Sequence, residues 1–180
     1  SKEVKQNDIF FAIKGKNKDG NLFVKEAFNN GASLAVVSSL KKDEKKIKTK
    51  DTLKFLTKAS SLFRENIPCK IIGITGSCGK TSLKELIGKT LNKISKATYS
   101  PKSFNNKFGV PLSLFNLSQK DNYGVLEIGM DKKGEIDNLS KIIKPDVAVI
   151  TNISYAHIKN FKNIKQIALA KSEIIKNIKE

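Results

Sequence analysis

Short apolar runs alternate along this chain with longer segments in which apolar residues recur at every third or fourth position. Residues 9–15 (IFFAIKG) and 32–38 (ASLAVVS) predict strands, and residues 21–30 between them predict a short helix. Apolar residues at helical spacing predict a further helix over 52–65, which ends before the turn at Pro68. The first part of the chain therefore predicts a small α/β unit.

The alternation becomes regular from residue 70 onward. Apolar strands are predicted at 70–75 (KIIGIT), 123–129 (YGVLEIG) and 147–152 (VAVITN). Helices are predicted at 81–95, 134–143 and from about residue 164, the first with Leu83, Leu86, Ile87, Leu91 and Ile94 on one face. This order is typical of βαβ units, in which helices cover both faces of a parallel sheet. We predict an α/β fold with a small N-terminal domain over 1–66 and a second domain over 67–180.

The charge balance first suggests nucleic acid as a partner. The 180 residues include 34 Lys+Arg against 17 Asp+Glu, a formal net charge of +17, and clustered basic residues release counterions from a phosphate backbone. However, Arg64 is the single arginine, and arginine is the residue that contacts phosphate and guanine in a bidentate manner. We interpret the excess of Lys, Asn and Ile as codon bias and predict no nucleic-acid partner. The lysine-rich segment 41–50 is interpreted as a solvated loop.

Cysteine content and hydropathy indicate the compartment. Cys69 and Cys78 are too few for a disulfide framework or a zinc site, which favours a reducing, cytoplasmic setting. No apolar run approaches the roughly 18 residues of a membrane helix, and the polar start is not typical of a signal peptide. We therefore expect a cytoplasmic monomer without membrane insertion. Because the chain opens without Met and closes inside a helical pattern, we also expect a piece of a longer protein.

The most informative motif follows the strand at 70–75, where a glycine-rich turn runs directly into a helix. In that context backbone N–H groups and the helix dipole bind phosphate, Lys80 reaches the β- and γ-phosphates, and the Thr81 hydroxyl holds Mg²⁺. One departure is that Ile74 stands where the first glycine of the usual motif is expected. The alternative is a glycine-rich turn that happens to contain a lysine. We predict a phosphate site formed by Gly76, Ser77, Cys78, Gly79, Lys80, Thr81 and Ser82.

Other candidate residues follow the predicted strands. Glu127 ends one strand, at the edge where open α/β sheets bind ligands, and there it could coordinate Mg²⁺ or simply pair with a lysine. His157, the single histidine, follows another strand, although a lone histidine more often has a structural role. Asn105 and Asn106 precede a short apolar helix, and asparagine pairs favour turns.

Dispersed segments of the chain resemble the Mur ligases of peptidoglycan synthesis. DIFFAIKGKNKDGNLFVKEAFNNGASLAVV resembles the N-terminal uridine-nucleotide domain of that family, and GITGSCGKTS resembles its ATP loop, including the missing first glycine. SFNNKFGVPLSL, LEIGMDKKGEIDNLSKIIKPDVAVITNISYAHIKNF and ALAKSEI resemble the stretches that follow. The run EIGMDKKGEI favours the members that add D-alanyl-D-alanine to UDP-N-acetylmuramoyl-tripeptide over those that add the third peptide residue.

The resemblance implies an ATP-dependent amide ligase with two Mg²⁺ ions. It implies that residues 76–82 contact ATP, that Thr81 and Glu127 bind one Mg²⁺, and that His157 binds the second. In the family a lysine that matches Lys171 is often carbamylated and then bridges to metal. Four residues are implied to be catalytic: Lys80, Lys171, Asn105 and Asn106.

In the implied reaction the tripeptide carboxylate attacks the γ-phosphate of ATP, and the amine of D-alanyl-D-alanine then displaces phosphate from the acyl phosphate. Two alternatives remain. One is another ligase of the same class, such as a third-residue-adding ligase or a folylpolyglutamate synthetase, and the other is a basic P-loop ATPase that binds nucleic acid. We expect no amide bond from this chain alone, because a third domain closes the site in the family.

Overall fold

Two compact units make up the chain, which a computed structural model describes over residues 3–15, 17–41, 43–155 and 158–179. The first unit is Ser1–Lys58 and the second is Ala59–Glu180. The division falls inside helix α2 (Thr52–Glu65), whose bounds are those that the apolar spacing predicts. The assignment of 1–66 and 67–180 as functional domains remains a prediction.

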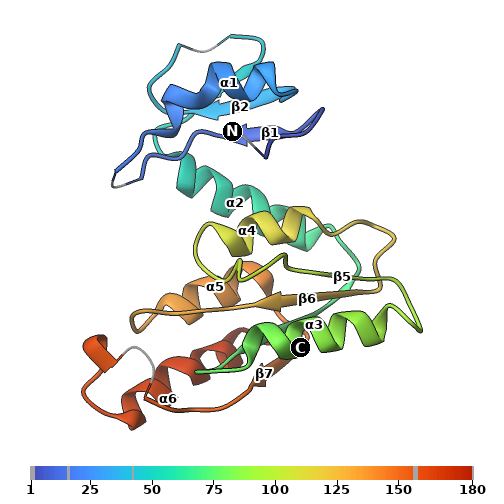
Figure 1. The fold of residues 1–180 in the computed structure, drawn as a ribbon, viewed down its shortest axis with the longest axis vertical. Helices are drawn as coiled ribbons and strands as arrows, with labels where there is room; N and C mark the ends of the chain where they lie inside the picture. The colour runs from blue at the N-terminus through green and yellow to red at the C-terminus, as the bar shows by residue number, and fades with distance from the viewer. Residues whose placement is uncertain (1–2, 16, 42, 156–157, 180) are drawn as a thin grey trace. The chain divides into compact units, whose positions relative to one another are not determined.

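A three-stranded parallel sheet forms the first unit. Its strands run in the order β1-β2-β3 and comprise β1 (Ile9–Phe11), β2 (Leu34–Val37) and β3 (Lys46–Lys48). The 3-10 turn η1 (Gly20–Phe23) and helix α1 (Val24–Asn29) lie between β1 and β2 in the chain, and Figure 1 shows α1 beside β2. The core of this unit is small and consists of the buried residues Ala12, Val24, Ala35 and Val37.

Strand β3 corrects one expectation, because it lies in the lysine-rich segment that the charge pattern predicts to be a loop. Ile47 pairs with Val36 of β2 in parallel register, and lysines stand on either side of it. A three-residue strand at a sheet edge is formed by main-chain hydrogen bonds rather than by burial. Ile47 is the one apolar residue of β3 and is 38% exposed. The segment therefore has no run of apolar residues that would predict a strand.

The second unit contains a four-stranded sheet in which every strand pair is parallel. The strands run in the order β5-β6-β4-β7 and comprise β4 (Lys70–Thr75), β5 (Ala97–Tyr99), β6 (Tyr123–Glu127) and β7 (Val147–Ile150). The predicted α/β fold with parallel sheets is therefore confirmed. The short edge strand β5 was not predicted, because three residues are too few for the alternation of apolar positions to be seen.

Helices of the second unit bury most of its core on one face of the sheet. These elements are α4 (Gly109–Phe115), α5 (Glu135–Ile143), α6 (Ile164–Ser172) and the 3-10 turn η3 (Glu173–Asn177), and a further 3-10 turn, η2 (Ile158–Asn160), precedes α6. Buried residues of α4, α5 and α6 pack with Ile71, Leu126 and other strand residues in one cluster. The buried Glu173 carboxylate accepts hydrogen bonds from the backbone N–H groups of Gly134 and Asp137, and so caps the start of α5.

Helix α3 (Lys80–Leu91) lies on the other side of the sheet from α4 and α5, as Figure 1 shows. Its buried residues are Lys84 and Gly88, whereas Leu86 is 63% exposed. The apolar pattern of 81–95 is therefore a misleading guide to the buried face of this helix. A Cβ atom on Gly88 would lie 2.3 Å from a ring carbon of Tyr99, so the helix approaches β5 closely through a glycine.

Arg64, near the end of α2, joins the amino-terminal ends of two strands to the end of α5. Its guanidinium donates to the backbone carbonyls of Ile143 and Lys144 and pairs with Asp146 at 2.9 Å. The Asp146 carboxylate also accepts from the backbone N–H of Ile71 at 2.7 Å. Because the Arg64 side chain is only 3% exposed, the single arginine of this chain has a structural role.

Replacing Arg64 should therefore be costly. Arg64→Met leaves several buried carbonyls without their donor and the Asp146 carboxylate without its cation, and we expect a loss of about 3–5 kcal/mol in the free energy of unfolding. Urea denaturation followed by circular dichroism measures this loss. In the control Lys141→Met, which removes an exposed pair with Asp137, the change should stay within about 0.5 kcal/mol. A loss below about 1 kcal/mol for Arg64→Met would contradict the assigned role.

Candidate nucleotide-phosphate and metal site

The loop between β4 and α3 depends on glycine at two positions. Gly76 has φ 145° and Gly79 has φ 78°, values that residues with a Cβ atom rarely adopt. A Cβ atom on Gly76 would also lie 1.9 Å from the hydroxyl oxygen of Thr151, so this glycine allows close packing against the segment after β7. At Gly79 no atom lies within 4 Å of such a Cβ, and the requirement there is conformational.

Residues 151–154 hold the outer side of this loop. The backbone N–H of Ser77 donates to the Asn152 carbonyl, and that of Cys78 donates to the Asn152 side-chain oxygen, both at 3.0 Å. The Thr151 hydroxyl donates to the Cys78 carbonyl at 2.6 Å, and the Ser154 N–H donates to the Ser77 hydroxyl at 2.9 Å. The sequence carries no signal for these supporting residues, since only the pairing of β4 with β7 brings them to the loop.

Backbone donors at the start of α3 are available for an anion. The N-cap Gly79 has no side chain that could accept a hydrogen bond, and the first N–H groups of a helix have no partner within the helix. The helix dipole favours negative charge at the same place. The Lys80 amine lies across the loop and donates to the carbonyls of Gly76 and Ser77 at 2.9 and 3.2 Å. The geometry suits a phosphate group.

Thr81, Glu127 and Asn105 come together beside the loop. The Thr81 hydroxyl donates to one oxygen of the Glu127 carboxylate at 2.7 Å, and the Asn105 amide donates to the other oxygen at 2.7 Å. Glu127 ends β6 and is only 1% exposed. Its carboxylate is held by neutral donors, and no lysine or arginine among the described residues forms a salt bridge with it. The paired-lysine alternative for Glu127 is therefore not observed.

Lys171 is a buried amine near the same loop. Its side chain lies on α6 and the residue is 1% exposed. Burial, followed by repulsion from Lys80, lowers the pKa of Lys171 from 10.5 to about 8. The sequence carries no signal for this property, because Lys171 stands among many lysines and only packing distinguishes it.

Asn106, another predicted site residue, is not hydrogen-bonded to the described residues of this cluster. The side-chain oxygen of Asn106 accepts from the backbone N–H groups of Phe108 and Gly109, both at 3.0 Å, in the turn that leads into α4. This contact is the turn role that asparagine pairs favour. The catalytic assignment of Asn106 stays a prediction. His157, predicted to bind a second Mg²⁺, lies outside the residues that the structure describes.

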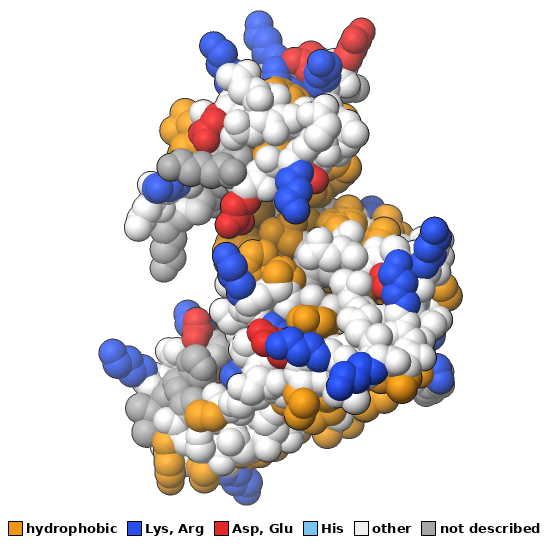
Figure 2. Space-filling model, turned by 45° about the vertical axis from the view of Figure 1, so that its right-hand side comes forward, with side chains coloured by type: hydrophobic (Ala, Val, Ile, Leu, Met, Phe, Trp, Pro, Cys, Tyr) orange, Lys and Arg blue, Asp and Glu red, His pale blue; other side chains and the backbone are white. Residues whose placement is uncertain are grey.

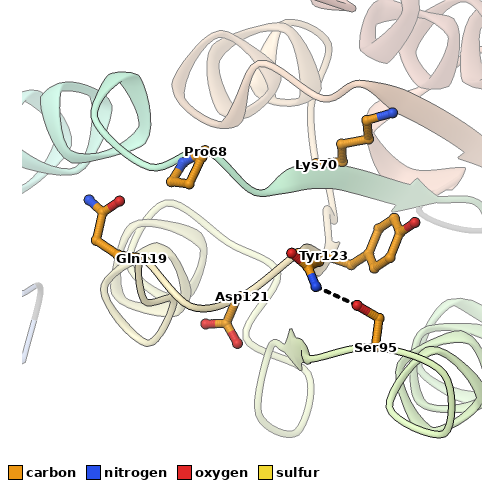
Figure 3. A pocket seen from close by; sticks show the side chains of 7 residues that line it. Pro68, Lys70, Ser95, Gln119, Asp121 and Tyr123 are labelled. Carbon is orange, nitrogen blue, oxygen red and sulfur yellow. Dashed lines mark hydrogen bonds between the residues drawn. The ribbon is translucent and has the colours of Figure 1, made fainter.

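A separate hollow of about 390 Å³ lies at the amino-terminal ends of β4 and β6, at the opposite end of these strands from the phosphate loop (Figure 3). It is lined by Pro68, Lys70, Ser95, Gln119, Asp121, Asn122 and Tyr123. Its polar side chains are largely engaged with one another or with backbone, as in the bond from Asn122 to Ser95. Nothing in this lining indicates a particular ligand.

Two further observations concern the charged surface and the hydropathy of the helices. On the face drawn in Figure 2, lysine side chains are scattered and interspersed with acidic ones. Among the described residues, no helix is long and apolar enough to cross a membrane. The absence of a nucleic-acid partner remains a prediction.

The parallel sheet, with a glycine-rich loop between the carboxyl end of β4 and helix α3, defines an α/β unit of the P-loop type, and comparison with known proteins identifies its class. The profile of the Mur ligase middle domain matches residues 74–180. The chain belongs to the Mur ligase family, which confirms the resemblance seen in the sequence.

Comparison with individual proteins shows which members of the family this chain is similar to. The UDP-N-acetylmuramoyl-tripeptide--D-alanyl-D-alanine ligase of Rickettsia prowazekii is 38% identical over 180 residues, which cover 98% of this chain and 40% of that protein. MurF from Acinetobacter baumannii superimposes with a TM-score of 0.89 at 36% identity, covering 99% of this chain and 40% of that one. MurF from Thermotoga maritima, solved in complex with ADP, gives 0.86 at 34% identity, covering 99% and 42%. The chain therefore spans about 40% of the length of these relatives.

The lowered pKa of Lys171 has a measurable consequence for stability. Below pH 8 the amine is charged in both folded and unfolded states, so the cost of burying it is fully present. Between pH 8 and 10.5 the unfolded chain binds more protons than the folded one, and stability rises with pH. Relative to Lys171→Met, the wild type should gain about 2 kcal/mol in the free energy of unfolding from pH 7.5 to 10.

Urea denaturation at several pH values tests this expectation. The control is Lys165→Met, which removes an exposed lysine on the same helix and should give no such trend. A difference between wild type and Lys171→Met that does not change with pH would show that the amine of Lys171 is solvated.

Proposed function

We propose that this chain contributes the nucleotide-phosphate and magnesium site of an ATP-dependent ligase that adds D-alanyl-D-alanine to UDP-N-acetylmuramoyl-tripeptide. The observation that carries the proposal is the contact of the buried Glu127 carboxylate with the Thr81 hydroxyl, 2.7 Å apart at the start of α3. The substrates come from the names of the relatives, which share 32–38% identity with this chain. The activity belongs to a protein of those relatives' length.

The pair formed by Thr81 and Glu127 fits a magnesium ion. Mg²⁺ prefers oxygen ligands in an octahedron with bonds of about 2.0–2.1 Å, so that adjacent ligands lie roughly 3 Å apart. A hydroxyl and a carboxylate oxygen 2.7 Å apart come close to that spacing. When bound, Mg²⁺ neutralises charge on the phosphate oxygens. A second ion at His157 remains part of the proposal from the family resemblance.

Each of the described site residues has a separate role in the transfer of the phosphoryl group. The N–H groups at the start of α3 hold phosphate oxygens, and the Lys80 amine turns from the carbonyls of Gly76 and Ser77 toward the transferred group. Asn105 holds the Glu127 carboxylate by donating to the oxygen that Thr81 does not contact. The tripeptide carboxylate attacks the γ-phosphorus of ATP and ADP leaves, which gives an acyl phosphate. The incoming amine then attacks the acyl carbon, and inorganic phosphate and a proton are released as the amide bond forms.

Carbamylation of Lys171 is supported by its lowered pKa. Only a neutral amine adds to CO₂, and formation of the N–C bond releases a proton to water. With a pKa of about 8, a substantial share of the amine is neutral at pH 7.5, whereas an ordinary lysine is almost entirely charged. The product would be a carboxylate in the neighbourhood of Lys80, where the present charges repel.

A third-residue-adding ligase is the nearest alternative. A protein that continues this chain to the length of its relatives should convert UDP-N-acetylmuramoyl-tripeptide, D-alanyl-D-alanine, ATP and Mg²⁺ to the pentapeptide product, detected by mass spectrometry. With UDP-N-acetylmuramoyl-dipeptide and a free diamino acid it should give no product. The reverse result would assign the chain to the other ligase.

Nucleotide binding tests the role of Lys80 directly. Removing the ammonium in Lys80→Ala should weaken binding of a non-hydrolysable ATP analogue by about tenfold or more, because a charge-assisted hydrogen bond to phosphate is lost. Isothermal titration calorimetry on the 180-residue chain measures this change. Lys89→Ala, on the exposed side of the same helix, should bind like the wild type. Equal affinities for wild type and Lys80→Ala would remove the phosphate assignment.

The role of Glu127 is tested by magnesium dependence. Glu127→Gln keeps the shape of the side chain and its contact with Thr81 but loses the negative charge that Mg²⁺ requires. We expect the gain in affinity on adding Mg²⁺ to fall at least tenfold, while affinity without Mg²⁺ stays the same or improves. An unchanged magnesium gain would exclude Glu127 as a ligand.

A further inference from the structure

Helix α3 buries Lys84, a residue outside the apolar face that the sequence predicts for this helix. Lys84 is 0% exposed and lies one turn beyond Thr81, on the same face of the helix. Meanwhile Leu86 of the same helix is 63% exposed. Burying a lysine is expensive unless its amine is hydrogen-bonded, and the Lys84 amine has such a partner.

The Lys84 amine reaches the loop that follows β5. It donates to the backbone carbonyl of Lys102, a residue with φ 48°, in the left-handed region that a side chain with a Cβ atom rarely adopts. Such a conformation is unfavourable for a residue with a side chain. The bond from Lys84 therefore holds the loop at a position where the backbone itself does not favour the observed shape.

The loop held by Lys84 wraps around Glu127. At its start, the Ser100 hydroxyl accepts from the Glu127 N–H at 3.3 Å. At its end, the carbonyl of Asn105 accepts from the Gly129 N–H at 2.7 Å, and the Asn105 amide donates to the Glu127 carboxylate. Lys102 lies between these two anchored ends, so the amine of Lys84 ties the middle of the loop to α3.

We infer that Lys84 is a positioning residue for the magnesium site, and this inference rests on the function proposed above. By joining α3 to the loop, it sets the distance between Thr81, which the helix carries, and Asn105, which the loop carries. Both side chains bind the same Glu127 carboxylate. Lys84 thus acts through Asn105 and touches neither nucleotide nor metal.

The test is magnesium-dependent nucleotide binding by the 180-residue chain. The affinity of a non-hydrolysable ATP analogue is measured by calorimetry with and without Mg²⁺, and the ratio of the two affinities is the magnesium gain. In Lys84→Met we expect this gain to fall about tenfold, as is typical when an outer-shell partner of a metal ligand is lost. Affinity without Mg²⁺ should stay within about twofold, because the phosphate-binding N–H groups are untouched.

Two controls separate positioning from general damage. Lys89→Met removes a lysine whose side chain is 65% exposed on the same helix, and it should leave both affinities unchanged. In an Asn105→Ala background, Lys84→Met should lower the magnesium gain by less than about twofold more, since residues that act through one contact are not additive. If Lys84→Met does not fold, Lys84→Gln replaces it. The glutamine keeps a polar group in the buried position, but its amide nitrogen lies one bond closer to the backbone than the lysine nitrogen and does not reach the Lys102 carbonyl in the same way.

The outcomes are distinguishable. A magnesium gain equal to the wild type in a folded Lys84 variant overturns the inference and leaves the proposed function intact. An equal loss of affinity with and without Mg²⁺, or full additivity with Asn105→Ala, also overturns it, because either result indicates general destabilisation. A wild type that binds the nucleotide analogue with no magnesium gain contradicts the proposed function and the inference with it.

Discussion

A buried carboxylate at the end of a central strand is the constraint on which the rest of the site depends. Glu127 is 1% exposed and must have hydrogen-bond donors, because a buried charge without partners is prohibitively costly. Its two oxygens are bonded by side chains from α3 and from the loop after β5. The requirement to satisfy one side chain therefore brings a helix, a strand and a loop to the same place.

Parallel strand order makes this convergence possible. Strands β4, β6 and β7 are neighbours in the sheet, and their carboxyl ends lead into the phosphate loop, Glu127 and residues 151–154 respectively. At the opposite end, Arg64 binds the carbonyls that end α5 and the carboxylate that precedes β7. One end of the sheet is thus stabilised by a buried arginine, and the other presents donors and oxygen ligands.

Helix α3 departs from the usual rule that a helix buries its apolar residues and exposes its charged ones, because it buries Lys84 and exposes Leu86. The first turn of α3 follows the glycine-rich loop directly. The inner face of the helix contacts β5 through Gly88 and the loop after β5 through Lys84. Its apolar residues are then left half-buried or exposed in this chain. Hydropathy alone could not reveal this orientation, because the contacts that decide it come from Tyr99 and Lys102, 11 and 18 positions further along the chain.

The sequence by itself determined the α/β class, the bounds of β4 and α2, and the glycine-rich loop that leads into α3. These features depend on local spacing, on glycine and on the order strand, loop, helix, all of which can be read over a few residues. Only the tertiary structure decided that β3 and β5 exist, that Lys171 is a buried amine with a lowered pKa, and that Lys84 and Arg64 bind distant carbonyls. In a chain with 34 basic residues, one lysine resembles another until packing removes water from a few of them.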